Sequence, residues 1–354
     1  MNTSPQLPKL SVIVPARNEG LAIRQSLESL LRQTYPNLEI IAVNDRSTDE
    51  TGPLMDAVAA TDERCRVIHI EELPAGWLGK NHAMHVGAEL ADGELLLFGD
   101  GDVQHEPQSL EVAVDYLQQE NLQHLCLLPR MIADTWLEKS MIGFFGMAIA
   151  IGQQVHLVRS QVARSYVGVG AFNLIDAKLY EKFGGHSVIR MDVVDDIRLG
   201  KLAQLYGGKQ DFLMARELMS LRWYHSAWDM ICGLEKNAFA SLNYSLLQVL
   251  LYTVVYFVAM LAPFVLPFVL DWPTSAGFVA TAGLWLFLYA FACRTMKCPW
   301  IVVPTFPLAA FLVSFAFWRS TWITLRQGGI RWRDSFYSLK ELRANRFRVS
   351  DHSG

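Results

Sequence analysis

The three long uncharged stretches of the chain limit most strongly what it can fold into. The first runs over residues 244–270 without an Asp, Glu, Lys or Arg, and two more follow at 276–293 and 300–318. About 20 apolar residues suffice for a helix to span the hydrocarbon core of a bilayer, whereas buried helices of soluble proteins are rarely uncharged for so long. We therefore expect a hydrophobic transmembrane region at 241–323, with two to three spanning segments.

The part of the chain that precedes this region alternates between two hydrophobic periods. Short runs rich in Val, Ile and Leu predict strands, and apolar residues at helical spacing lie between them. The predicted strands are 10–14, 38–43, 66–70 and 95–98. This alternation predicts βαβ units in a parallel sheet, which we assign to one α/β domain at residues 1–240. Ligands bind at the carboxyl ends of such strands, and polar clusters follow the first, second and fourth of them.

The cluster after the fourth strand contains two aspartates, Asp100 and Asp102, on one turn. Both carboxylates can face one divalent cation, and Mg²⁺ or Mn²⁺ bound to a diphosphate needs hard oxygen ligands of this kind. Such an ion would neutralise a diphosphate leaving group. An isolated Asp-Gly turn is more often simply solvated, but the neighbouring clusters favour a metal site here.

Three further groups complete this edge of the predicted sheet. Pro15 to Glu19 follows the first strand, Asp45 to Asp49 follows the second, and Lys80 opens the next predicted helix. Carboxylates at these places suit a base and a ribose, while helix-capping groups and Lys80 suit phosphate. Each group alone is explained by a loop or a helix cap, and the sequence lacks the GxxxxGK[ST] pattern of a Walker A loop.

The motifs LSVIVPARNE, VNDRSTDET, GWLGKNHAMHVG and LLLFGDGDV resemble, in order and spacing, the nucleotide-sugar-binding motifs of glycosyltransferase family 2. The resemblance covers roughly residues 8–240 and implies the family's GT-A fold, a Rossmann-like mixed α/β sheet. It also implies a Mg²⁺ or Mn²⁺ ion held by Asp100 and Asp102. The donor-binding residues that it implies are Pro15, Arg17, Glu19, Asp45, Lys80 and Asp100.

The pair Asp195-Asp196 precedes a predicted helix and resembles the acidic pair of the family, usually Glu-Asp, whose Asp is the general base. Inverting transfer needs one carboxylate to take the proton of the acceptor hydroxyl, and burial beside a like charge raises a carboxyl pKa toward that task. Asp196 is the better match and Asp195 the main alternative, with Asp192 less favoured. Acidic residues also gather at helix N-termini for structural reasons alone.

Two segments in the second half of the domain are expected to bind the acceptor. One is the glycine-containing loop Gly168–Asn173, which includes Gly170. The other, Met219-Ser-Leu-Arg222-Trp223, resembles the family's Gln-x-x-Arg-Trp motif, which implies diphosphate binding by Arg222 and stacking of Trp223 on the acceptor. The alternative is that Arg222 is an ordinary surface arginine and that Trp223 only packs against a helix. Met219 stands in place of the Gln, which weakens any inference to a processive polysaccharide synthase.

The basic tail at 324–354 resembles the carboxyl end of bacterial lipid-glycosylating members, those associated with hopanoid, carotenoid and ceramide-like acceptors. Its segment GIRWRDSFY is similar to their Gly-Ile-x-Trp-Arg-Gly-x-x-Tyr pattern, with Asp334 in place of the second Gly. A membrane lipid acceptor is implied, and Arg331 and Arg333 suit lipid headgroups or donor phosphate; a snorkelling amphipathic tail is the alternative. The apolar run 141–151 is too short to span, and indicates an interfacial helix that guides a lipid or a buried core helix.

The location of the protein follows from charge and cysteine usage. Basic residues flank spanning helices mainly on the cytoplasmic side, and the tail carries seven of them. The N-terminus lacks a signal-peptide pattern, and five scattered cysteines without a CxxC pair fit a reducing compartment. We therefore expect a multi-pass protein of the cell (inner) membrane with a cytoplasmic catalytic domain. Both ends on one side require an even number of crossings, so one stretch, such as 300–318, is re-entrant or interfacial, or there is a further crossing.

Together these features predict an inverting glycosyltransferase that moves a hexose from a nucleotide-diphosphate sugar, foremost a UDP-sugar, to a membrane lipid. A processive polysaccharide synthase is the alternative within the same chemistry. A non-catalytic membrane protein that binds nucleotide sugars is the alternative of another class. The net charge of −4 gives no basic character that would indicate nucleic acid as a partner. The sugar, the acceptor and the oligomeric state do not follow from the sequence.

Overall fold

The computed structural model describes residues 7–160, 165–345 and 347, which fall into two compact units. The first unit takes in Met1–Arg130, Gln153–Leu221 and Arg346–Gly354, and the second takes in Met131–Gly152 and Arg222–Asn345. Two basic residues of the tail, Arg346 and Arg348, lie outside the described residues.

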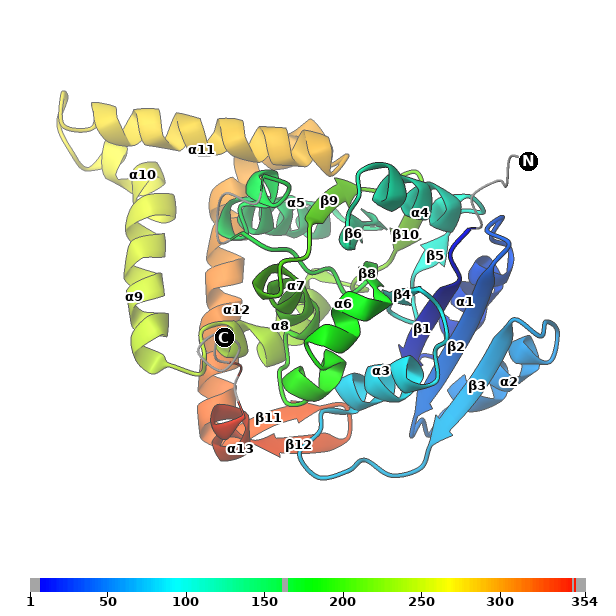
Figure 1. The fold of residues 1–354 in the computed structure, drawn as a ribbon. Helices are drawn as coiled ribbons and strands as arrows, with labels where there is room; N and C mark the ends of the chain where they lie inside the picture. The colour runs from blue at the N-terminus through cyan, green and yellow to red at the C-terminus, as the bar shows by residue number, and fades with distance from the viewer. Residues whose placement is uncertain (1–6, 161–164, 346, 348–354) are drawn as a thin grey trace. The chain divides into compact units, whose positions relative to one another are not determined.

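A seven-stranded mixed sheet forms the centre of the first unit (Figure 1). Its strand order is β3-β2-β1-β4-β8-β6-β9. Strand β8 runs antiparallel to β4 and β6, whereas the other neighbours pair in parallel. The bounds are β1 Leu10–Ala16, β2 Leu38–Asp45, β3 Cys65–Ile70, β4 Leu95–Phe98, β6 His124–Leu128, β8 Asn173–Asp176 and β9 Gln210–Met214. The expected mixed α/β sheet is thereby confirmed.

The register of the parallel strands brings the polar clusters to one edge. Ile13 of β1 pairs with Ile41 of β2 on one side and with Phe98 of β4 on the other. All three side chains are at most 1% exposed, as expected for central strands that are covered on both faces. The segments that leave the carboxyl ends of β1, β2 and β4 therefore emerge side by side.

Helices cover this sheet and supply its remaining apolar contacts. Side chains from α3 and α7, including Met84 and Leu202, join Ile13, Ile41 and Phe98 in one buried cluster. The helices of the unit are α1 Ile23–Leu31, α2 Thr51–Ala59, α3 Gly79–Glu89, α4 Ser109–Gln119, α6 Ala177–Lys182 and α7 Asp195–Leu205, with the 3₁₀ turns η1 Val155–Leu157 and η2 Gly185–Ile189. The short strands are β5 Gln104–His105 and β10 Met219–Leu221, which pair with each other, and β7 Arg130–Met131, at which the chain passes from the first unit into the second.

The second unit is helical and contains three segments long and apolar enough to cross a membrane, Leu246–Phe268, Ala276–Thr295 and Trp300–Gln327. Large apolar side chains on them face outward, since Val255 is 65% and Phe287 69% exposed. The elements are α5 Trp136–Gly152, α8 Ala227–Ser241, α9 Leu246–Tyr256, the π-turn η3 Phe257–Leu261, α10 Ala262–Val265, η4 Leu266–Phe268, α11 Ala276–Thr295, η5 Trp300–Thr305, α12 Phe306–Gln327, β11 Gly329–Trp332, β12 Ser335–Ser338 and α13 Leu339–Ala344. The expected C-terminal apolar helices are thereby confirmed.

Helix α5, which contains the apolar run 141–151, packs within the second unit. Its Phe144 and Met147 share a buried cluster with Tyr289 of α11 and Phe306 of α12. The hydroxyl of Tyr289 donates to the backbone oxygen of Ser140 at 2.7 Å. Over its central turns this run is therefore buried against two of the segments that are long and apolar enough to cross a membrane.

We predict that Gly200→Ala lowers the stability of the first unit. A Cβ on Gly200 of α7 would lie 1.7 Å from the backbone oxygen of Val167, so the helix and the loop would have to separate. Overpacking of this kind costs about 2 kcal/mol or more, and a fall of several degrees in Tm is expected by scanning fluorimetry. Gly152→Ala is the control, because a Cβ there meets nothing within 4 Å. Equal Tm values for the two variants would contradict the prediction.

Candidate active site

Lys80 joins two of the acidic motifs at the carboxyl edge of the sheet. It is the second residue of α3, and its Nζ lies 2.8 Å from Asp100 Oδ1 and 3.6 Å from Asp195 Oδ2. Burial alone would lower the pKa of Lys80, but the negative charges of Asp100, Asp195 and Asp196 outweigh burial and raise this pKa. The ammonium group therefore stays charged and offsets the repulsion among the carboxylates.

Asp196 is held in one orientation by backbone groups. The Gly170 N–H donates to its Oδ2 at 2.9 Å, and the Ile197 N–H donates to its Oδ1 at 2.8 Å. The side-chain amide of Asn173 donates to the backbone oxygen of Asp196 at 3.4 Å. A Cβ on Gly168 would lie 1.9 Å from that same oxygen, so only a glycine lets the loop approach α7 this closely.

Gly170 stands where the two acidic motifs meet. An added Cβ would lie 3.0 Å from Asp100 Oδ2, 3.4 Å from Asp196 Oδ2 and 3.5 Å from Lys80 Nζ. The loop that contains Gly170 thus forms one wall of the space between the Asp100 turn and the start of α7. The structure therefore brings Lys80, Asp100, Asp195, Asp196 and Gly170 together in the first unit.

Two carboxyls in this region have raised pKa values. Burial and the adjacent charge of Asp195 raise the pKa of Asp196 from 3.8 to about 7. Burial and the charges of Asp100 and Glu19 raise the pKa of Asp102 from 3.8 to about 7. A carboxyl with a pKa near 7 can both hold and release a proton under physiological conditions, which suits a general base.

The turn at Asp100 and Asp102 offers hard oxygen ligands beside the end of β1. A Cβ on Gly101 would lie 3.4 Å from the Pro15 backbone oxygen, which places this turn against Pro15. Among the described residues no group of three or more His, Cys, Asp or Glu side chains is positioned to hold a metal ion. Two carboxylates fit Mg²⁺ or Mn²⁺ nonetheless, since such ions take most of their remaining ligands from phosphate oxygens and water.

Asp45 connects the end of β2 to its neighbours. Its carboxylate is 3.8 Å from Arg17 Nη1 and accepts from Arg46 Nε at 2.7 Å, although the residue is only 3% exposed. A Cβ on Gly79 would lie 2.2 Å from Asp45 Oδ2, so the start of α3 also touches this carboxylate. Sequence reasoning missed Arg46 and Gly79; the available signal was their place beside Asp45 and Lys80 within motifs already singled out.

The backbone at Glu19 is anchored to the second polar cluster. Its N–H donates to Thr51 Oγ1 at 2.8 Å, and the preceding Asn18 accepts from the Thr48 N–H at 2.8 Å. Asn18 adopts a positive φ of 54°, a conformation that asparagine tolerates better than most residues. The first and second clusters thus form one connected edge.

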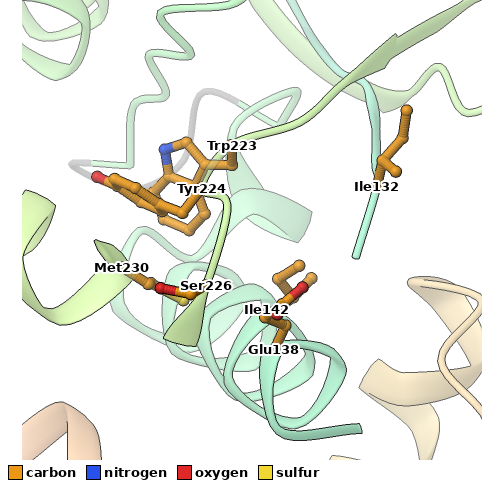
Figure 2. Close-up of a pocket in the computed structure, with 7 residues that line it drawn as sticks. All are labelled: Ile132, Glu138, Ile142, Trp223, Tyr224, Ser226 and Met230. Carbon is orange, nitrogen blue, oxygen red and sulfur yellow. The ribbon is translucent and has the colours of Figure 1, made fainter. Parts of the chain in front are cut away.

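Arg222 and Trp223 belong to the second unit. Arg222 donates to both carboxylate oxygens of Asp134, at 2.8 and 3.2 Å. The Trp223 ring lies 4.5 Å from the ring of Phe145 in α5, centroid to centroid. Figure 2 shows a small, mainly apolar pocket beside it, which is lined by Ile132, Glu138, Ile142, Trp223, Tyr224, Ser226 and Met230.

Part of the chain that carries this edge is similar to a known protein family. Residues 11–184 match the model of Glycosyl transferase family 2. This segment contains Lys80 at the start of α3 and the turn of Asp100 and Asp102, whereas Asp195 and Asp196 lie beyond it.

Two relatives and one solved structure resemble the chain. Glycosyltransferase GlyG of Streptococcus pneumoniae serotype 4 is 35% identical over 112 residues, which are 32% of this chain and 36% of the relative. The 4,4'-diaponeurosporenoate glycosyltransferase of Staphylococcus aureus is 26% identical over 193 residues, 54% of this chain and 50% of the relative. The chain thus spans half or less of the length of these relatives.

The mannosyltransferase PcManGT from Pyrobaculum calidifontis, solved with GDP-Man and Mn²⁺, superposes with a TM-score of 0.51 over 87% of both chains. Its sequence is 19% identical to this chain, so the likeness shows a shared fold.

We predict that Asp196→Asn stabilises the metal-free protein more at pH 8 than at pH 5. A carboxyl whose pKa is about 7 when folded and near 3.8 when unfolded retains its proton better in the folded state, so its contribution to stability falls as the pH rises between those values. Asparagine removes this loss.

The measurement is the Tm of variant minus wild type, in EDTA, at the two pH values. Burial lowers the pKa values of His105, His124 and His186, and these groups act in the opposite direction in both proteins. The difference between the two proteins therefore isolates Asp196. A difference that is the same at pH 5 and pH 8 would show that Asp196 is an ordinary carboxylate.

Proposed function

We propose that the protein is an inverting glycosyltransferase that moves a hexose from a nucleotide-diphosphate sugar, foremost a UDP-sugar, to a hydroxyl or carboxylate of a membrane lipid. The observation that carries the proposal is the site around Lys80, where the segment that matches Glycosyl transferase family 2 meets the start of α7. There Asp196, fixed by the Gly170 N–H at 2.9 Å, shares one edge of the sheet with Asp100 and Asp102. The names of the two relatives, both glycosyltransferases, support the class of reaction.

In this proposal Asp196 is the general base and Asp195 a neighbour that tunes it. With a hydroxyl acceptor, Asp196 accepts its proton while that oxygen forms a bond to the anomeric carbon; a carboxylate acceptor is already ionised and attacks without loss of a proton. The bond from the anomeric carbon to the diphosphate breaks on the opposite side, which inverts the configuration and releases the nucleoside diphosphate. The charge of Asp195 supports the raised pKa of Asp196 and so favours proton uptake near neutral pH.

The donor would lie along the edge formed by the ends of β1, β2 and β4. Pro15, Arg17, Glu19 and Asp45 are assigned to the nucleoside, because their positions follow the first two strands. Lys80 is assigned to the donor phosphates, and the resemblance of the Arg222 segment to the family's motif assigns Arg222 to the diphosphate. A Mg²⁺ or Mn²⁺ ion held by Asp100 and Asp102 would supply electrostatic stabilisation of the leaving diphosphate.

A membrane lipid is the proposed acceptor for two reasons. The second unit has three helices that are long and apolar enough to cross a bilayer, so the enzyme would work at a lipid surface. One relative is named for 4,4'-diaponeurosporenoate, and similarity to it covers 54% of this chain. Trp223, beside its mainly apolar pocket, is the proposed contact for the acceptor, with Gly170 next to the base.

The arrangement of the helices suggests an even number of crossings. Helix α11 runs crosswise to α9 and α12 within the second unit (Figure 1). If α9 and α12 cross the bilayer, α11 lies along it, and the two ends of the region return to one side. We assign that side to the cytoplasm, because the tail after α12 is basic.

Release of nucleoside diphosphate by the purified full chain in detergent tests the proposal. UDP- and GDP-sugars are screened with Mn²⁺ or Mg²⁺ and a bacterial lipid extract. Lipid-dependent release should fall by at least about 100-fold in Asp196→Asn, since general-base catalysis contributes roughly 10² to 10⁴. Asp102→Ala should lose activity and require more Mn²⁺.

Asp115→Asn is the matched control, because this carboxyl is exposed on α4, away from the sheet edge. Nucleotide binding without turnover on any lipid would favour the non-catalytic alternative. Full turnover in Asp196→Asn would mean that another group is the base.

We predict that Trp223→Ala raises the KM for the lipid acceptor by roughly tenfold, on the scale of one lost stacking contact, and leaves the affinity for the donor unchanged. Trp223→Phe, which retains an aromatic ring against Phe145, should recover most of the loss. Steady-state kinetics with lipid and donor varied separately distinguish the two effects. An equal change in both constants would indicate that Trp223 only supports the fold.

A further inference from the structure

The third apolar segment is longer than a bilayer core. Trp300–Gln327 has 28 residues, and at 1.5 Å per residue it extends about 42 Å. The hydrocarbon core is about 30 Å thick, so about eight residues of the segment project beyond it. Residues 300–318 carry no charge, whereas Arg319 and Arg326 lie after them. The projecting part is therefore the carboxyl end of α12.

Polar contacts with α8 agree with this placement. Arg319 Nε donates to Glu235 Oε1 at 2.5 Å, and the Phe239 N–H donates to Ser320 Oγ at 3.0 Å. The Arg319 guanidinium also lies 5.0 Å from the ring of Trp228. A charged pair of this kind is costly inside hydrocarbon, so the turn at Arg319 belongs at the membrane surface.

The exposed residues that follow include both aromatic and basic side chains. Trp322 and Arg326 are one turn apart on α12, and Trp322 is 66% exposed. In the hairpin β11–β12, Arg331 pairs directly with Phe336, and both side chains are exposed. The next pair, Ile330 with Tyr337, lies on the opposite face of the hairpin, and both side chains are buried. Tryptophan and arginine together are typical of the headgroup layer.

Charge in this part of the chain is strongly positive. Over residues 319–345, six basic residues face two acidic ones, which gives a net charge of +4. The acidic residues are Asp334 at the hairpin turn and Glu341, whose carboxylate caps α13 through Ser338. A net positive surface directly after a spanning helix attracts anionic lipids.

We propose that Trp322, Arg326, Arg331 and Phe336 form a contact surface for the anionic phospholipid headgroups of the bilayer, at the point where α12 leaves the hydrocarbon. The two aromatic side chains enter the interface, and the two guanidinium groups bind headgroup phosphates. This surface rests on the proposed membrane insertion, but it does not depend on the proposed glycosyl transfer.

The test uses the full chain in nanodiscs made from equal amounts of phosphatidylcholine and phosphatidylglycerol. After transfer to mild detergent, native mass spectrometry gives the ratio of the two lipids that stay bound. Wild type should retain phosphatidylglycerol preferentially. The double variant Arg326→Gln/Arg331→Gln should reduce this preference by about tenfold or more, since each arginine near an anionic surface contributes about fivefold.

The control is Arg24→Gln/Arg32→Gln, which makes the same change in net charge at two exposed positions of the first unit. Its lipid preference and its Tm should match the wild type, and the Tm of the test variant should match as well. Equal retention of both lipids by the wild type, or an unchanged preference in the test variant, overturns the inference. A chain that does not enter nanodiscs overturns it together with the proposed membrane insertion, while lipid preference without any transferase activity supports it and contradicts only the proposed reaction.

Discussion

The ion pairs of Lys80 are the interaction on which the candidate site depends. Lys80 Nζ lies 2.8 Å from Asp100 Oδ1 and 3.6 Å from Asp195 Oδ2. These two aspartates are distant in sequence and belong to different elements. Without a cation between them, the acidic turn after β4 and the acidic start of α7 would repel each other across a partly buried space. The positive charge allows the two motifs to share one edge, and a donor diphosphate bound there would find both a cation and the ligands for a metal ion close by.

Close approach between the backbone of the Gly168–Gly170 loop and that of α7 then fixes the orientation of the Asp196 side chain. Gly168 lets its loop reach the Asp196 backbone oxygen, and Gly200, one helical turn later on the same face of α7, lets Val167 of this loop come close to the helix. As a result, the Gly170 N–H meets the Asp196 carboxylate at 2.9 Å. The orientation of the proposed base therefore comes from glycines that carry no chemistry themselves, and changes that push the loop away from α7 should disturb stability and catalysis together.

The sequence predicted the parts of the structure that are governed by local pattern. Short apolar runs that end in polar clusters marked β1, β2 and β4, and the rule for parallel sheets placed those clusters together. Gly79 could not be placed from the sequence, because its contact with Asp45 depends on how the end of β2 and the start of α3 pack. Nor could the sequence show that α5 packs with α11 and α12, since an eleven-residue apolar run fits a core helix and an interfacial helix equally well. Antiparallel β8 was accessible through the family resemblance alone.

Length and charge together constrain the membrane region more than hydropathy does. Hydropathy alone gives three segments that can each span, an odd number. In the proposed arrangement, the crosswise course of α11 takes one of these segments out of the crossing direction. The excess length of Trp300–Gln327 would bring the charged end of α12 into the headgroup layer. The ion pair of Arg319 with Glu235 would then hold α8 at the same depth as this charged end. Since α8 begins a few residues after Trp223, the proposed acceptor contact would lie close in the chain to the membrane surface, where a lipid presents its polar end.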